Sequence, residues 1–280
     1  PTIAQIYGTE PEAFYKAALI VATLGFDGID INMGCPDKSV SGRGAGAGLI
    51  RTPDLAKHIV KSVKQAVQDW SEGQTMENAG IRPKVTEAVH KMIEKYNYTS
   101  TRRILPVSVK TRMGFETPTV KVWIGHLLET EPVNITVHGR TLKQMYTGQA
   151  DWEQIGLAAE TAKGSNTYVM GNGDIKSKED ALQKIQHYGL HGVLIGRATF
   201  GNPWIFTGKE IDYKTRLKTG LAHCRAFEEL LPDGNFLSLR KHMAWYCTGF
   251  DHAAEMRARL MTVKTAQEVE EIVNPIISNN

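Results

Sequence analysis

Residues 31–50 of the chain read Ile-Asn-Met-Gly-Cys-Pro-Asp-Lys-Ser-Val-Ser-Gly-Arg-Gly-Ala-Gly-Ala-Gly-Leu-Ile. An apolar run that begins at Gly28 ends abruptly at Gly34-Cys35-Pro36, and a glycine-rich loop follows. This order predicts a thiol at the C-terminal tip of a β-strand, which is where parallel α/β folds carry their chemistry. Pro36 stiffens the backbone beside the thiol, and the glycines allow the loop to approach a ligand closely.

Cys35 has two interpretations. A free cysteine is often an inert core residue, but the polar and glycine-rich residues around Cys35 favour a functional thiol. The glycines of this loop do not form a dinucleotide-binding fingerprint. They lack the G-x-G-x-x-G spacing and the acidic residue that such a motif places about 20 positions later.

Composition places the chain among ordinary globular proteins. With 280 residues, 41% of them hydrophobic and 22% charged, it can form one large α/β domain and a small appendage. We expect no membrane association, because no apolar run approaches the ~18 residues that cross a bilayer and the N-terminus lacks a secretory signal. Three widely spaced cysteines fit a reducing cytoplasm. The net charge of +3 permits a nucleic-acid partner without requiring one, and we expect no metal site because zinc-ligand spacing is missing.

Six short apolar runs end in polar residues or glycine, and we interpret each run as a strand. Helix-length amphipathic segments separate most of them, with start signals at Thr9–Glu12 (a capping box), Thr52-Pro53, and Ser177 with Asp180. This alternation predicts parallel strands joined by crossover helices. The six runs are Thr2–Gly8, Gly28–Asn32, Val107–Gly114, Asn134–Arg140, Tyr168–Asp174 and Gly192–Arg197.

The polar strand ends favour a (β/α)₈ barrel of the TIM type, since such a barrel assembles one site from many strands at one rim. We assign residues 1–208 to this catalytic domain, although the chain gives six strand signals and not eight. The polar segment at about 71–103 holds an amphipathic helix signal, and we interpret it as a surface insertion without a catalytic role.

Residues 209–280 have a different pattern, which contains helices only. We expect helices at 216–231, 236–248 and 251–263, the third with Asp251 as its N-cap, and a last helix that begins at the capping box Thr265–Glu268. This small helical domain carries several basic residues. They form either a solvated helix face or an RNA-facing patch, and the residues alone favour neither. They are Arg240, Lys241, Arg257, Arg259 and Lys264.

Polar residues at the last strand ends suggest a phosphate site. Gly196-Arg197 and Asn172-Gly173-Asp174 lie where barrels commonly bind phosphate, with arginine as a forked donor and Asp174 as an acceptor for a polyol. Lys110 would place a positive charge near the barrel axis, where it would favour the anionic reduced form of a flavin. Each residue alone is compatible with a structural ion pair, but their convergence favours a ligand pocket.

These motifs resemble, in order and spacing, those of the tRNA-dihydrouridine synthases. The resemblance covers residues 1 to about 273 apart from the 71–103 segment, and the Leu239–His242 stretch with Tyr246 and Gly249 is similar to the bacterial B-type branch. The strings that carry it are Asp30-Ile-Asn-Met-Gly-Cys-Pro36, Val109-Lys-Thr-Arg-Met-Gly114, His138-Gly-Arg-Thr141, Gly171-Asn-Gly-Asp174 and Gly196-Arg197.

The resemblance implies reduction of a tRNA uridine to 5,6-dihydrouridine, with NADPH as reductant and bound FMN as the hydride relay. Cys35 matches the proton donor, which would protonate uracil C5 after hydride reaches C6. Asn32 matches a contact to the target base, and we assign Arg140, Arg240 and Lys241 to substrate binding. The positions that match FMN binding are Gln5, Lys110, His138, Asn172, Gly173, Asp174, Gly196 and Arg197.

Members of the family begin earlier, with a strand that carries Ala-Pro-Met and a second βα unit. We therefore expect this chain to lack the first one or two βα units of the barrel. We expect a cytoplasmic monomer with tRNA as its partner. Two alternatives stay open: another FMN barrel that acts on a small molecule, similar to dihydroorotate dehydrogenase, and a catalytically dead RNA-binding remnant.

Overall fold

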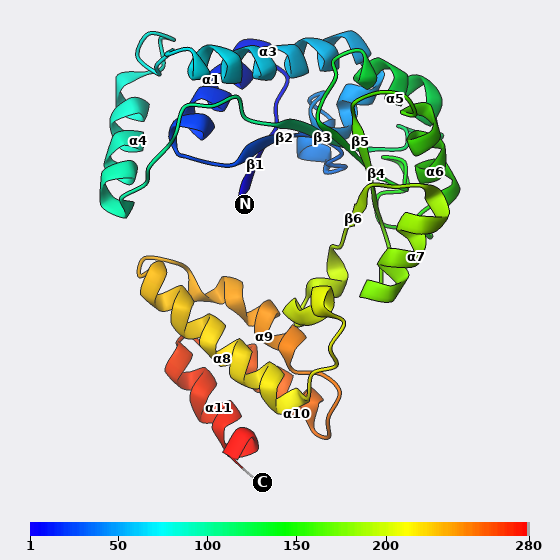
Figure 1. Ribbon diagram of the computed structural model, residues 1–280. Helices are drawn as coiled ribbons and strands as arrows, with labels where there is room; N and C mark the ends of the chain where they lie inside the picture. The colour runs from blue at the N-terminus through cyan, green and yellow to red at the C-terminus, as the bar shows by residue number, and fades with distance from the viewer. Residues whose placement is uncertain (279–280) are drawn as a thin grey trace. The chain divides into compact units, whose positions relative to one another are not determined.

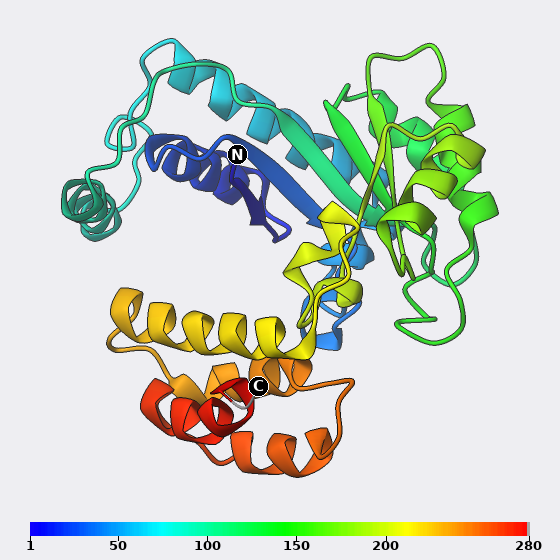
Figure 2. The same ribbon diagram turned by 60° about the horizontal axis from the view of Figure 1, so that its bottom comes forward.

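The computed structural model describes residues 1–278, and its contacts divide the chain into two compact units. The first unit comprises Pro1–Gly173 and Gln183–Leu194, and the second comprises Asp174–Leu182 and the chain from Ile195 onward. The sequence-based boundary between residues 208 and 209 stays a prediction. Figures 1 and 2 show the helices and strands of both units.

The first unit is built on a parallel sheet, and all six predicted strands are confirmed. The strands are hydrogen-bonded in chain order from β1 to β6, so that β1 and β6 are the edges of the sheet. This architecture confirms the α/β class and the parallel crossovers. The strands are β1 (Ile3–Ile6), β2 (Gly28–Met33), β3 (Val107–Arg112), β4 (Asn134–His138), β5 (Tyr168–Asn172) and β6 (Gly192–Leu194).

The two faces of this sheet differ in polarity. In β2, Ile29, Ile31 and Met33 are fully buried, whereas the alternating Asp30 and Asn32 are only half-buried. Since side chains alternate between the faces of a strand, one face packs beneath the helices and the other carries the polar residues. Burial of each such aliphatic side chain contributes about 1.5–3 kcal/mol, which fixes the strand register.

Helices of the first unit pack along the apolar face and against one another (Figure 1). The Tyr15 hydroxyl donates to Asp69 over 2.6 Å and links the first two helices of this layer. The helices are α1 (Pro11–Thr23), α3 (Pro53–Ser71), α5 (Val120–Leu128) and α6 (Trp152–Thr161); α7 (Lys178–Tyr188) spans both units, and the short α2 (Lys38–Ser41) and η1 (Gly46–Arg51) lie in the glycine-rich loop.

The predicted helix in the 71–103 segment is confirmed as α4 (Pro83–Tyr96). Only Thr86 and Val89 of this helix are buried, and Met92 and Tyr96 on its apolar side are about half exposed. The helix therefore packs loosely on the rest of its unit.

Two predicted helix starts are wrong. The N-cap of α1 is Glu10 and not Thr9, because Pro11 takes the first helical position and no side chain caps the helix. In the second unit, α10 (Ala253–Leu260) begins after His252, whose φ of 63° is left-handed, so Asp251 is not its N-cap. The helix starts at Ser177 and Thr265 are confirmed, since each hydroxyl accepts from the backbone N–H three residues later, while the carboxylates of Asp180 and Glu268 accept from the N–H groups of Lys176 and Lys264, one residue before the cap.

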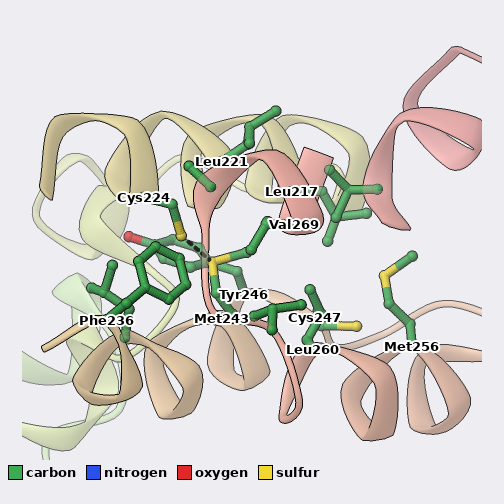
Figure 3. Packing of buried hydrophobic residues seen from close by; sticks show 14 of the residues in the cluster. Leu217, Leu221, Cys224, Phe236, Met243, Tyr246, Cys247, Met256, Leu260 and Val269 are labelled. Atoms are coloured by element: carbon green, nitrogen blue, oxygen red, sulfur yellow. Dashed lines mark hydrogen bonds between the residues drawn. The ribbon is translucent and has the colours of Figure 1, made fainter. Parts of the chain in front are cut away.

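The second unit contains a helical bundle with its own core (Figure 3). Leu217, Met243, Leu260 and Val269 come from four different helices and are fully buried in this core. The predicted helix at 236–248 is divided into η4 (Phe236–Leu239) and α9 (Arg240–Tyr246). The other elements are η2 (Arg197–Thr199), η3 (Pro203–Thr207), α8 (Tyr213–Leu230) and α11 (Ala266–Ser278).

Candidate functional site

The candidate site begins at the C-terminal end of β2, where the chain turns into the glycine-rich loop. The side-chain oxygen Oδ1 of Asn32 accepts hydrogen bonds from the backbone N–H groups of Gly34 (3.0 Å) and Cys35 (2.9 Å). The Cys35 carbonyl in turn accepts from the N–H of Ala47 at 3.1 Å. The predicted position of the thiol at a strand tip is therefore confirmed, and both sides of its backbone are held.

Gly46 has a specific steric reason to be glycine. Its φ is +56°, and a Cβ at this position would lie 2.8 Å from the Cys35 carbonyl oxygen and 3.1 Å from the Cys35 Cβ. A side chain here would therefore push directly on the residue that carries the thiol. The predicted approach of the glycine-rich loop to a ligand stays a prediction, but at Gly46 the loop lies close to Cys35.

A row of polar side chains runs from Asn32 across the first strands. Nδ2 of Asn32 donates to Gln5 at 2.8 Å, and Nε2 of Gln5 donates to Asp30 at 2.7 Å. The Ser108 hydroxyl donates to the other Asp30 oxygen at 2.6 Å. Burial raises the pKa of Asp30, against the hydrogen bonds from Ser108 and Gln5 and the charge of Lys110, which lower it.

Lys110 continues this row on β3. Its Nζ donates to Oδ1 of Asn172 on β5 at 3.1 Å, and Nδ2 of Asn172 donates to the Leu194 carbonyl at 2.9 Å. Burial lowers the pKa of Lys110, while the nearby Asp30 carboxylate acts in the opposite direction. The sheet therefore brings together Gln5, Asn32, Lys110 and Asn172 as predicted.

His138 ends β4, is 9% exposed, and lies 3.2 Å from the guanidinium of Arg140. Arg140 is 2% exposed and also donates to the carbonyls of Thr147 (3.3 Å) and Gly148 (2.6 Å). Its guanidinium thus holds the loop that follows β4. Its assignment to substrate binding stays a prediction.

Gly173 directly follows β5 with a φ of +134°, and a Cβ there would lie 2.5 Å from the Cβ of Ala150. The position therefore requires glycine. The predicted phosphate-site residues Asp174, Gly196 and Arg197 belong to the second unit, where Arg197 and Asp174 form an ion pair of 2.7 Å.

Arg112 is a feature that the sequence interpretation missed. It is 1% exposed, and its guanidinium donates at 2.8 Å to the carbonyls of Gly34, Thr141 and Met145. The residue before the thiol is thereby tied to the loop after β4. The sequence shows that Arg112 ends the Lys-Thr-Arg string, but no local pattern indicates which backbone carbonyls its guanidinium binds.

The two predicted substrate-binding residues of the helical unit, Arg240 and Lys241, lie in different environments. Arg240 donates to the carbonyls of Val263 (2.8 Å) and Thr262 (3.0 Å), so it holds the turn after α10. Lys241 is exposed on α9. Their contacts with a substrate stay predictions.

A parallel sheet with Cys35 held at the end of β2 and a row of amide and ammonium groups on one face has the features of an α/β enzyme. The chain belongs to the dihydrouridine synthase family, whose model, described as "Dihydrouridine synthase (Dus)", matches residues 1–71 and 81–280. Residues 72–80 lie outside this match, which therefore includes α4. The resemblance drawn from the sequence had left out the longer segment 71–103.

Sequence relatives agree with this membership. A "Probable tRNA-dihydrouridine synthase" of Staphylococcus aureus (strain Mu50 / ATCC 700699) is 33% identical over 98% of this chain and 74% of its own length. A "Probable tRNA-dihydrouridine synthase 2" of Bacillus subtilis (strain 168) is 32% identical, with 98% and 75% covered. A crystal structure of DHODH from Eimeria tenella has a TM-score of 0.47 at 15% identity, over 72% of this chain and 53% of that one.

No helix in residues 1–278 is both long enough and apolar enough to span a bilayer.

Proposed function

We propose that this protein reduces a uridine of tRNA to 5,6-dihydrouridine, with bound FMN and with NADPH as the reductant. The placement of Cys35 carries the proposal: a thiol at the tip of β2, held through Asn32 beside the polar row of the sheet. The names of the relatives in Staphylococcus and Bacillus support the choice of tRNA as substrate.

The residues of the polar row fit a flavin. Lys110 supplies an ammonium group, and Gln5 and Asn172 supply amides that can both donate and accept, which suits the carbonyl and nitrogen edge of the ring system. When bound, FMN would supply the hydride that reduces the C5–C6 bond of uracil. The assignments of His138, Gly173, Asp174, Gly196 and Arg197 to FMN binding are predictions of the same proposal.

Cys35 would supply the proton. A positioned acid of this kind accelerates a reaction by about 10²–10⁴-fold. The thiol proton passes to uracil C5 as hydride reaches C6, so that one hydride and one proton are added across the double bond. Asn32 orients the turn that carries the thiol, and it is also the proposed contact to the base. The target base must leave the RNA stack to reach such a site.

The decisive experiment is a single-turnover reduction of tRNA by the Cys35→Ala variant in the full chain with reduced FMN. We expect flavin content and NADPH oxidation by oxygen to be preserved, while uridine reduction falls by about 10²–10⁴-fold. Cys35→Ser should restore little, because a hydroxyl is a much weaker acid than a thiol.

Cys224→Ala is the matched control, since this thiol is 1% exposed in the helical core and should affect stability only. A normal rate of uridine reduction by Cys35→Ala would refute the proton-donor role. Wild-type protein without flavin absorbance, or with activity on orotate but not on tRNA, would refute the proposed function.

A further inference from the structure

The basic charge of the chain is concentrated in one segment. Residues 82–103 contain six basic and two acidic residues, a net charge of +4, whereas the whole chain has a net charge of +3. The predicted RNA-binding part, residues 209–280, contains ten basic and ten acidic residues and is neutral overall. A polyanionic substrate is therefore attracted most strongly to the segment that contains α4.

The lysines of α4 share one side of the helix, which we call the lysine face: Lys84, Lys91 and Lys95. Their spacings of seven and four residues bring the three side chains within about 40° of one another around the helix axis. All three are exposed. Lys91 lies 2.6 Å from Glu87, but Lys91 and Lys95 are also like charges at i and i+4, an arrangement that costs a few tenths of a kcal/mol. An anion bound along this face would remove that repulsion.

Exposed aromatic side chains border the lysine face at the end of α4. Tyr96 and Tyr98 are each 47% exposed and stack on one another with ring centroids 5.6 Å apart. Nζ of Lys95 lies 5.0 Å from the Tyr96 ring. Cations interleaved with exposed aromatic rings are typical of surfaces that bind nucleic acid, because rings stack on bases or riboses while ammonium groups bind phosphates.

The remaining arginines at the end of the segment have a structural role. Arg102 donates to the carbonyls of Trp70 and Gln74, and Arg103 forms an ion pair of 3.0 Å with Asp27. These contacts anchor the chain that follows α4 to the first unit. Arg102 and Arg103 stay exposed while they make these contacts, and the lysine face with Arg82 at the start of the helix extends the exposed positive surface of the segment along α4.

We propose that the lysine face of α4 binds the sugar–phosphate backbone of tRNA, as a contact additional to the uridine site. This proposal rests on the proposed function, because it takes tRNA to be the substrate. The contact is to backbone phosphates and is therefore independent of the base that is reduced. Its effect should appear in affinity and not in the chemical step.

The experiment compares Lys84→Ala/Lys91→Ala/Lys95→Ala with Lys61→Ala/Lys121→Ala/Lys163→Ala in the full chain. The control removes the same number of charges from exposed positions of the first unit, in α3, in α5 and just after α6. We measure tRNA affinity against salt concentration, flavin content and single-turnover uridine reduction at saturating tRNA. We expect the α4 variant to lower the slope of log K against log salt by about 2–3, since each lost phosphate contact removes about 0.7–0.9. Flavin content and the saturated rate should not change.

Equal slopes for the α4 variant and the control would overturn the lysine-face contact while leaving the proposed function intact. An unchanged slope together with a change of molecular mass in solution would also overturn it, and would assign the surface to a second copy of the chain. Wild-type protein that binds no tRNA would overturn the proposed function and this contact together.

Discussion

Buried thiols in the helical unit give the stability of this protein a definite dependence on pH. Burial raises the pKa of Cys224 from 9.0 to about 12, and that of Cys247 to about 11. Between pH 9 and 11 the unfolded chain has therefore lost thiol protons that the folded unit still binds. Because the unfolded state then binds fewer protons, the free energy of unfolding falls as pH rises through this window.

We expect Cys224→Ala to reduce this alkaline loss. The variant should be less stable than the wild type at pH 8, since it loses packing and the S–H contact with Met243 at 3.3 Å. The measurement is the change in the free energy of unfolding of the helical unit between pH 8.5 and 10.5, which should be smaller in the variant. An identical decline in both proteins would contradict the assigned protonation.

Single residues of the site were only partly predictable from the sequence. Cys35, Asn32 and Lys110 stand in short motifs, and their positions at strand ends follow from the motifs alone. Asp30 and Arg112 belong to the same motifs, but their roles depend on partners that are far away in the chain, such as Gln5 for Asp30 and Met145 for Arg112. Tertiary folding brings these partners together, so no local pattern could have indicated them.

At the scale of elements, the strands were the easiest part to predict, because each is a short apolar run followed by polar residues or glycine. Helix starts were harder. At α1, Pro11 moved the cap from Thr9 to Glu10, and at α10 the left-handed His252 replaced Asp251. Both positions depend on backbone geometry, which a list of favoured capping residues does not contain.

The glycine-rich loop gives a prediction at this scale. Gly46→Ala should lower the stability by about 1–2 kcal/mol through its positive φ, and should also displace Cys35, because the new Cβ would lie 2.8 Å from the Cys35 carbonyl. We therefore expect a large loss of single-turnover uridine reduction with retained flavin content. Gly80→Ala is the control, with a similar φ of +66° and no atom within 4 Å of the added Cβ. Equal losses of activity in both variants would show that the contact with Cys35 is unimportant.

Across the whole molecule, the basic residues are of two kinds. Some arginines bind backbone carbonyls and stabilise the fold, whereas other basic side chains are exposed to solvent. In the helical unit, Arg240 donates to Val263 and Thr262, and Arg257 donates to the Cys247 carbonyl at 2.9 Å. Lys241 and Arg259 are exposed on their helices. Because Arg240 and Arg257 are engaged by backbone carbonyls, we expect phosphate contacts of this unit to fall on exposed residues such as Lys241 and Arg259.

We expect Lys241→Ala/Arg259→Ala to lower the salt dependence of tRNA binding by no more than about 2 in the slope of log K, with little effect on stability. Arg240→Gln should do the reverse: it leaves carbonyls without a charged donor and lowers the free energy of unfolding by about 1–3 kcal/mol, with an unchanged slope. Chemical unfolding and salt-dependent binding of the same preparations measure both quantities. A slope that falls in Arg240→Gln but not in the double variant would reverse the assignment, and would show that the Arg240 guanidinium leaves its carbonyls to bind phosphate.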